Sequence, residues 1–133
     1  MARVLAFTRD LLFGSQVQGA LTLAGHDVEL VAGESLLRER LTGNDDPAGA
    51  AVDVLVVDLT DADLEAASTV RALADSGALG TARTMGFYSH VDTAAREHAQ
   101  RAGIHLIVAR SRMAREGPQL VAGLLAGAQP AGE

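Results

Sequence analysis

The segment Val52-Asp53-Val54-Leu55-Val56-Val57-Asp58 contains the most continuously apolar strand that the sequence predicts, at 54–58. A strand that is apolar on both sides is typical of the centre of a parallel sheet, where helices cover both faces. The run ends in a carboxylate, so Asp58 is expected at the carboxyl edge of the sheet, where open α/β sheets bind their ligands. A carboxylate there can ligate a metal ion or act as a nucleophile, or it can be a solvated residue at the start of a loop.

Apolar runs of strand length alternate with longer Ala- and Leu-rich stretches on both sides of this segment. The runs predict five strands, at 3–8, 27–32, 54–58, 84–89 and 104–109. The longer stretches predict five helices, at 10–24, 35–41, 64–75, 92–102 and from Gly117-Pro118 onward. Each connection is long enough for a parallel crossover, so the pattern predicts an α/β fold, a three-layer doubly wound sandwich on a five-stranded parallel sheet.

Polar and glycine residues mark the ends of these elements. Asp10 precedes the first helix and Asp63 precedes the third, and each is expected to cap the helix that follows it. Gly25 is expected to end the first helix, since glycine readily adopts the left-handed conformation found there. The stretch Thr-Gly-Asn-Asp-Asp-Pro-Ala-Gly at 42–49 is the clearest loop in the chain.

Composition limits the classes of function. The 133 residues are expected to form one domain at 1–127, followed by a frayed tail at 128–133. The chain has no cysteine, which excludes disulfides and thiolate metal sites, and all 11 of its basic residues are arginine, which excludes a lysine Schiff base. A net charge of -6 disfavours nucleic acid and anionic membrane as partners. No segment has the apolar length of a signal peptide or a membrane span, so the cytoplasm is the expected compartment.

Polar residues follow the predicted strands, and the carboxyl ends of parallel strands meet at one edge of a sheet. The strand ends are Thr8-Arg9-Asp10, Ala32-Gly33, Asp58-Leu59-Thr60, Ser89-His90 and Ala109-Arg110-Ser111. The order of the units, the chain length, the aspartate ending the third strand and the hydroxyl ending the fourth resemble the receiver (CheY-like) domains of two-component response regulators. The resemblance covers essentially the whole chain, and it implies a flavodoxin-like sheet with the strand order 2-1-3-4-5.

The resemblance also implies roles for single residues. Asp58 corresponds to the phospho-acceptor of an active receiver, and Ser89 corresponds to its switch hydroxyl. An active receiver carries a pair of acidic residues that hold Mg²⁺ together with the phospho-acceptor. In this chain that pair corresponds to Thr8 and Arg9, neither of which is acidic.

The lysine that ends the fifth strand of a receiver corresponds to Ala109, or to Arg110 if the register slips by one residue, and the proline expected next is absent. Phosphoryl transfer to a carboxylate needs cations that offset the developing charge, and Mg²⁺ usually requires one or two carboxylates. Asp58 beside Arg9 is therefore a poor Mg²⁺ site. We expect Arg9 or Arg110 to neutralise Asp58 directly instead.

The leading interpretation is a stand-alone pseudo-receiver, a signalling domain that acts through protein–protein contacts, with no enzyme activity and no cofactor. Receivers typically meet partners or dimerise through the face that runs from the fourth helix to the fifth. That face corresponds to 92–125 here, so protein partners, with a homodimer among them, are expected on it.

Two alternatives remain open from the sequence. In the first, the chain is an atypical receiver that is phosphorylated on Asp58, with Asp10 and Asp58 as the Mg²⁺ ligands and Arg110 in place of the lysine. In the second, it is a flavodoxin-like domain that binds a small anionic ligand at the edge of the sheet, with Arg9, Ser89 and Arg110 facing the ligand.

Overall fold

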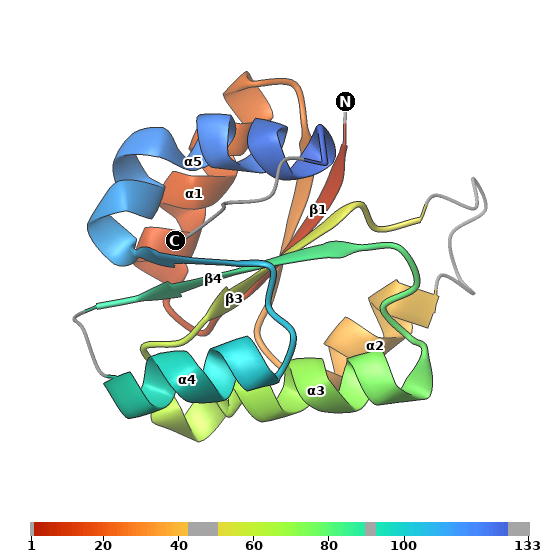
Figure 1. Ribbon diagram of the computed structural model, residues 1–133. Coiled ribbons are helices and arrows are strands. Elements are labelled where there is room, and N and C mark those ends of the chain that lie inside the picture. The colour runs from red at the N-terminus through yellow and green to blue at the C-terminus, as the bar shows by residue number, and fades with distance from the viewer. Residues whose placement is uncertain (1, 43–50, 90–92, 128–133) are drawn as a thin grey trace.

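The computed structural model describes residues 2–42, 51–89 and 93–127, which form one parallel sheet between two layers of helices (Figure 1). The strands are β1 (Arg3–Phe7), β2 (Asp27–Val31), β3 (Val54–Asp58), β4 (Arg83–Tyr88) and β5 (Leu106–Ala109). Their order, β2-β1-β3-β4-β5, confirms the predicted topology. Every residue of β3 is buried, as expected for a central strand that is covered on both faces.

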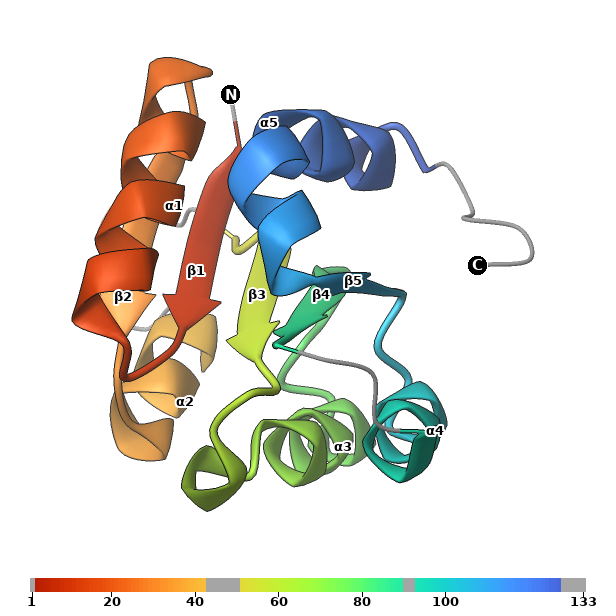
Figure 2. The ribbon, with the colours of Figure 1, turned by 90° about the vertical axis from the view of Figure 1, so that its left-hand side faces the viewer.

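Two apolar cores lie on opposite faces of the sheet (Figure 2). One face packs against α1 (Leu11–Leu23) and α5 (Arg110–Leu125), and the other packs against α2 (Glu34–Thr42), α3 (Ala66–Ser76) and α4 (Thr93–Arg101). A short 3-10 helix, η1 (Ala62–Leu64), precedes α3. The alternation of side chains along each strand supplies both cores, which explains why the strands are apolar on both sides.

The first helix has the boundaries that its sequence predicts. Asp10 caps α1, because its side chain accepts a hydrogen bond from the backbone N–H of Phe13 at 3.0 Å. Gly25 has a φ of 97° directly after the C-cap residue of α1, which confirms the predicted stop. Phe13, Val17 and Leu21 recur at four-residue spacing and bury one side of the helix.

The last helix does not begin where the sequence predicts. α5 starts at Arg110, directly after β5, and Pro118 lies inside it. The prediction from Gly117-Pro118 marked an irregularity within the helix, where Glu116 departs from helical geometry with φ -126° and ψ 17°. Proline has no N–H to donate and restricts the residues before it, so the helix bends near Pro118 while continuing through it.

The connection from β3 to α3 also differs from the prediction. Asp63 does not cap α3, because it lies within η1, and Asp61 is the residue that caps this short helix by accepting a hydrogen bond from the N–H of Asp63 at 3.1 Å. Glu65 then adopts a left-handed conformation with φ 50° between η1 and α3. The short helix η1 therefore precedes α3 where a single helix was predicted from residue 64. Four predicted features lie outside the described residues. They are the loop at 42–49 from residue 43 on, His90, the start of the fourth helix at 92 and the tail at 128–133.

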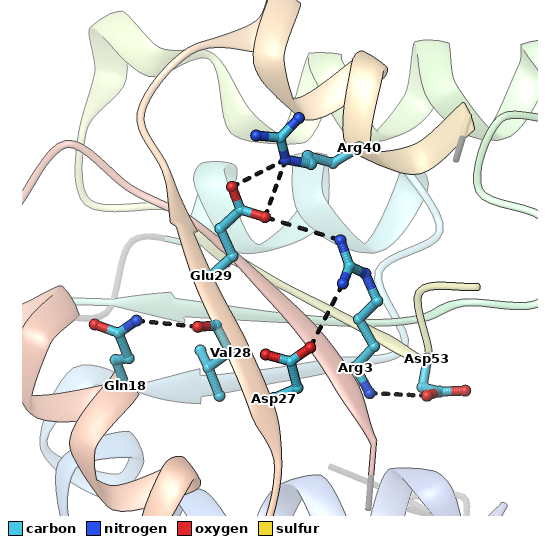
Figure 3. A network of polar contacts seen from close by, with 7 residues as sticks. All are labelled: Arg3, Gln18, Asp27, Val28, Glu29, Arg40 and Asp53. Carbon is cyan, nitrogen blue, oxygen red and sulfur yellow. Dashed lines mark hydrogen bonds and ion pairs between the residues drawn. The ribbon is translucent and has the colours of Figure 1, made fainter. Parts of the chain in front are cut away.

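A network of charged side chains lies at the amino-terminal ends of the edge strand β2 and its neighbour β1, beside α2 (Figure 3). Arg3 reaches Asp27 at 3.5 Å and Glu29 at 3.9 Å, and Arg40 of α2 donates to both carboxylate oxygens of Glu29 at 2.9 and 3.0 Å. Asp53 accepts a hydrogen bond from the backbone N–H of Arg3 at 2.9 Å. Charged side chains along an edge strand oppose pairing with a strand of another molecule.

A histidine joins β4 to the segment before β5. Nδ1 of His105 accepts a hydrogen bond from the backbone N–H of Thr84 at 3.0 Å, and the N–H of His105 donates to Oγ1 of Thr84, also at 3.0 Å. Partial burial of the ring lowers the pKa of His105, and the charge of Arg83 lowers it further. The fold therefore favours the neutral imidazole, which keeps Nδ1 free to accept.

This contact predicts a pH dependence of stability. Because the folded pKa of His105 lies below its ordinary value of 6.5, the stabilisation is complete above that pH and is lost as the pH falls through the lowered pKa. His105→Asn retains an acceptor near the same place and is expected to reduce the decline of the unfolding free energy below pH 6.5. Urea unfolding across a pH series measures this decline. The exposed His98 provides the matched control, His98→Asn. If His98→Asn reduced the decline of the unfolding free energy as much as His105→Asn does, the attribution of this decline to His105 would be contradicted.

Candidate functional site

Asp58 lies at the carboxyl edge of the sheet, and it is buried beneath two threonines. The residue is only 1% exposed. Its Oδ2 accepts a hydrogen bond from the hydroxyl of Thr8 at 2.7 Å, and its Oδ1 accepts from both the backbone N–H, at 2.8 Å, and the hydroxyl of Thr60. We refer to these three residues as the Thr8–Asp58–Thr60 cluster. Three hydrogen-bond donors from two threonines therefore occupy the carboxylate.

The register of the sheet brings Thr8 and Asp58 together. β1 and β3 are parallel neighbours in which Phe7 pairs with Val57, so the next residue of each strand lies at the same level. The backbone N–H of Thr8 donates to Val31 of β2 at 3.0 Å, and its hydroxyl accepts from the N–H of Asp10 at 3.0 Å. The Thr8 side chain is thus held between the sheet and the start of α1.

Thr60 reaches Asp58 through a turn that begins with the aspartate itself. An aspartate side chain that accepts from the backbone N–H two residues later is a common turn element. Leu59, between them, donates its N–H to the carbonyl of Phe87 at 2.8 Å, which ties the turn to β4. The Leu59 side chain lies directly over Gly86 of β4, where a Cβ atom would come within 2.6 Å of Cδ1 of Leu59.

Arg9 is paired with a carboxylate other than Asp58. Its Nε and Nη2 donate to the two carboxylate oxygens of Asp61, each at 2.7 Å. This two-bond contact raises the pKa of Arg9 and lowers the pKa of Asp61. The pair links the end of β1 to the start of η1 at the solvent-facing side of the site, with the Arg9 side chain about half exposed.

Arg110 is paired as well. Its Nη2 donates to Oδ2 of Asp10 at 2.8 Å, and its guanidinium carbon lies 4.3 Å from the ring centre of Phe13. The capping hydrogen bond from Phe13, followed by the charge and hydrogen bond of Arg110, lowers the pKa of Asp10. The stacked and hydrogen-bonded guanidinium fixes the start of α5 against the start of α1.

The expectation that Arg9 or Arg110 neutralises Asp58 is therefore wrong. Each arginine forms its ion pair with a different carboxylate, Asp61 or Asp10, and Asp58 is bound by hydroxyl and amide donors. The physical reason is burial: threonine hydroxyls reach the buried carboxylate within the packed interior, whereas the long arginine side chains pair with carboxylates at the surface and avoid the cost of desolvation.

The other predicted residues lie at the same edge. Thr8, Arg9 and Asp10 follow β1 and Arg110 follows β5, so all four lie at the carboxyl edge of the sheet. Ser89 follows β4 and lines an open hollow of about 420 Å³ between the start of α3 and α4. Its other lining residues include Thr60, Asp61, Tyr88 and His98. The role of Thr60 and the pairing of Asp61 with Arg9 were not among the predictions from the sequence. The Asp-x-Thr spacing was the available signal for the Thr60 turn.

The residues at the edge do not form a donor set that fits Mg²⁺. Threonine and arginine occupy the two positions where a receiver carries its acidic pair, and the nearby Asp10 is engaged with Phe13 and Arg110. No group of three or more histidine, aspartate or glutamate side chains in the described parts of the chain could hold a metal ion. A single buried carboxylate with two hydroxyls is a weak site for an ion that keeps a near-octahedral oxygen shell.

Comparison by sequence finds no match for this chain, whereas comparison by structure finds similar solved proteins. No family model matches the chain, and no curated protein matches it in sequence. Solved structures match it over nearly the whole length. A response regulator from Thermotoga maritima superposes with a TM-score of 0.78 at 14% identity, covering 95% of this chain and 98% of that one. A putative response regulator from Chloroflexus aurantiacus gives 0.79 at 17% identity, covering 94% and 98%.

Another similar structure is a LuxR-family two-component response regulator from Aurantimonas, with a TM-score of 0.72 at 24% identity, covering 97% of this chain and 88% of that one. The chain thus has the receiver, or CheY-like, fold.

In the described part of the chain, none of the helices combines the length and the apolar character needed to cross a lipid bilayer.

Proposed function

We propose that this protein is a pseudo-receiver, a domain with the receiver fold that signals through protein–protein contacts and is not phosphorylated by the Mg²⁺-dependent route. The observation that carries the proposal is the Thr8–Asp58–Thr60 cluster. Asp58 stands where the resemblance places the phospho-acceptor, but the residue is 1% exposed and both of its carboxylate oxygens accept hydrogen bonds from threonines.

Such a carboxylate is poorly suited to attack a phosphodonor. In-line transfer requires an oxygen that can approach the phosphorus atom, together with cations that stabilise the transferring oxygens. Arg9 and Arg110, the candidate cations at this edge, are bound to Asp61 and Asp10. Recruiting either of them would break an existing ion pair, so the atypical phospho-accepting alternative requires a rearrangement of the edge.

The same ion pairs argue against the small-ligand alternative. That interpretation needs Arg9 and Arg110 to face an anionic ligand, but in the structure a carboxylate of the chain itself neutralises each of them. These internal carboxylates would compete with any ligand of moderate affinity. No observation in the described residues favours a bound anion over the internal pairs.

Protein contacts are proposed for the face formed by α4, β5 and α5, whose described part is 93–125. This segment contains five arginines and two glutamates, in a chain with a net charge of -6. Glu97 pairs with Arg101, and Glu116 pairs with Arg112 and Arg115. The excess of arginine suits a partner with an acidic surface, since complementary charge steers association.

A magnesium titration tests whether the Thr8–Asp58–Thr60 cluster binds the metal. Chemical shifts of the backbone amides of Thr8, Asp58 and Thr60 are expected to remain unchanged as MgCl₂ is added, apart from the general effect of ionic strength. An equal ionic strength of NaCl is the control. Saturable shifts at these amides that appear with MgCl₂ alone, and that disappear in Asp58→Asn, would show a metal site and overturn the proposal.

A further inference from the structure

The outer face of α1 is uncharged and rich in exposed leucine. None of the thirteen residues of α1 is charged, which is unusual for a surface helix. Leu12 is 76% exposed and Leu23 is 92% exposed, and Leu11, about 100° round the helix from Leu12, is 69% exposed. Large apolar side chains at these exposures in a charge-free helix form a patch that requires an explanation other than packing of the core.

The exposed residues follow a regular helical spacing. Phe13, Val17 and Leu21 point into the core, and Figure 2 shows α1 at the outer edge of its layer, with α5 on its inner side. The outward positions are Leu12, Gln16, Gly19 and Leu23, separated by four, three and four residues. This is the spacing with which one helix packs against a second helix.

We propose that α1 is the contact surface of a homodimer in which the α1 helices of two copies pack antiparallel about a two-fold axis. The four outward positions are symmetric about the middle of the helix. In an antiparallel pair Leu12 therefore lies opposite Leu23 of the second copy, and Gln16 lies opposite Gly19. A large side chain meets a large one at each end, and the central glycine lets the two backbones approach closely.

Charge favours this surface over the others for contact between identical copies. Two copies with a net charge of -6 repel each other, so their contact is least costly where neither contributes charge. A two-fold contact through 93–125 would bring arginine near arginine, and the edge strand β2 carries the charged residues Asp27 and Glu29. The homodimer expected on the 92–125 face is accordingly better placed on α1, which leaves that face for a different partner.

The length of α1 limits the affinity expected for the dimer. A helix of thirteen residues is about 20 Å long, and one such pair buries less than the roughly 800 Å² per partner of a standard interface. The dimer is therefore expected to dissociate in the micromolar range or above. It does not depend on the state of Asp58, so it can fail while the proposed function stands, and the reverse also holds.

Sedimentation equilibrium of the full chain over a concentration series tests the dimer. The wild type is expected to shift from the 13.7 kDa monomer towards twice that mass as concentration rises. Leu12→Glu and Leu23→Glu are each expected to weaken association about tenfold or more, because they place a charge in an apolar contact. Leu125→Glu, at the exposed end of α5, is the matched control and is expected to leave the dissociation constant unchanged.

A charge-reversal pair tests the antiparallel arrangement itself. In the double variant Leu12→Glu/Leu23→Arg, each introduced carboxylate faces an introduced guanidinium of the other copy, so association is expected to recover relative to Leu12→Glu alone. A wild type that remains monomeric throughout the series would overturn the proposal. It would equally be overturned if Leu125→Glu dissociated the dimer as strongly as Leu12→Glu, or if the double variant associated no better than the single one. Circular dichroism of each variant establishes that the fold is intact.

Discussion

Thr8→Val is expected to lower the free energy of unfolding by about 3 kcal/mol. Valine has the shape of threonine, so the substitution removes only the hydroxyl, which donates to Asp58 and accepts from the N–H of Asp10. Both of these groups then lack a partner at a site where Thr8 and Asp58 are 3% and 1% exposed. An unpaired buried carboxylate oxygen is costly because the interior cannot replace the lost solvation.

Thr69→Val provides the matched control for this variant. Thr69 of α3 is 6% exposed and lies outside the Thr8–Asp58–Thr60 cluster, so a much smaller change in stability is expected there. Urea unfolding of the three proteins compares the two substitutions directly. Equal stability of Thr8→Val and the wild type would show that the Thr8 hydroxyl does not hold Asp58.

Gly86→Ala is expected to destabilise the protein by about 1 to 2 kcal/mol, because overpacking outweighs the small gain from replacing glycine in a strand. A Cβ atom at this position would lie 2.6 Å from Cδ1 and 3.0 Å from Cγ of Leu59. Leu59 must then move away from β4, and it connects Asp58 to Thr60. The crowding therefore strains the turn that supplies two of the three donors to Asp58.

The explanation by overpacking can be checked with two further variants. The double variant Gly86→Ala/Leu59→Ala shortens the obstructing side chain. Its loss of stability is therefore expected to be smaller than the sum of the losses in the two single variants. Gly123→Ala, in α5, has no atom within 4 Å of its added Cβ and is expected to raise stability by up to about 1 kcal/mol. Thermal unfolding measures both. A stabilising Gly86→Ala would contradict the described position of Leu59.

Much of the fold could be predicted from the sequence because its signals are local and repeated. The apolar run at 54–58 required a buried central strand, and Asp10 and Gly25 marked both ends of α1. The start of α5 could not be predicted in the same way. Its first seven residues contain only one strongly apolar residue, Met113, so the helical period is weak there and the turn signal of Gly117-Pro118 dominates.

The partners of the arginines could not be predicted because several carboxylates lie within reach of the same edge. Asp10, Asp58 and Asp61 all lie at or after the carboxyl ends of β1 and β3, and an arginine side chain is long enough to reach more than one of them. The choice depends on the three-dimensional course of the chain after β3, where η1 brings Asp61 to Arg9. The burial of Asp58 beneath Thr8 and Thr60 depends on packing that no short sequence pattern records.

The proposed loss of phosphoryl transfer has a chemical basis in the residues at the edge of the sheet. An active site of this type needs an exposed carboxylate, a metal held by neighbouring acids, and a free cation. Here the carboxylate is covered by hydroxyls, and both neighbouring arginines serve as structural ties between strand ends and helix starts. The same edge that would perform phosphoryl transfer is thus used to hold the fold together.

The most direct measurement is the intact mass of the protein after incubation with Mg²⁺ and acetyl phosphate, with an active receiver treated alongside as a positive control. The wild type is predicted to keep its unmodified mass, as Asp58→Asn does. A gain of one phosphoryl group by the wild type that requires Mg²⁺ and is absent from Asp58→Asn would contradict the account.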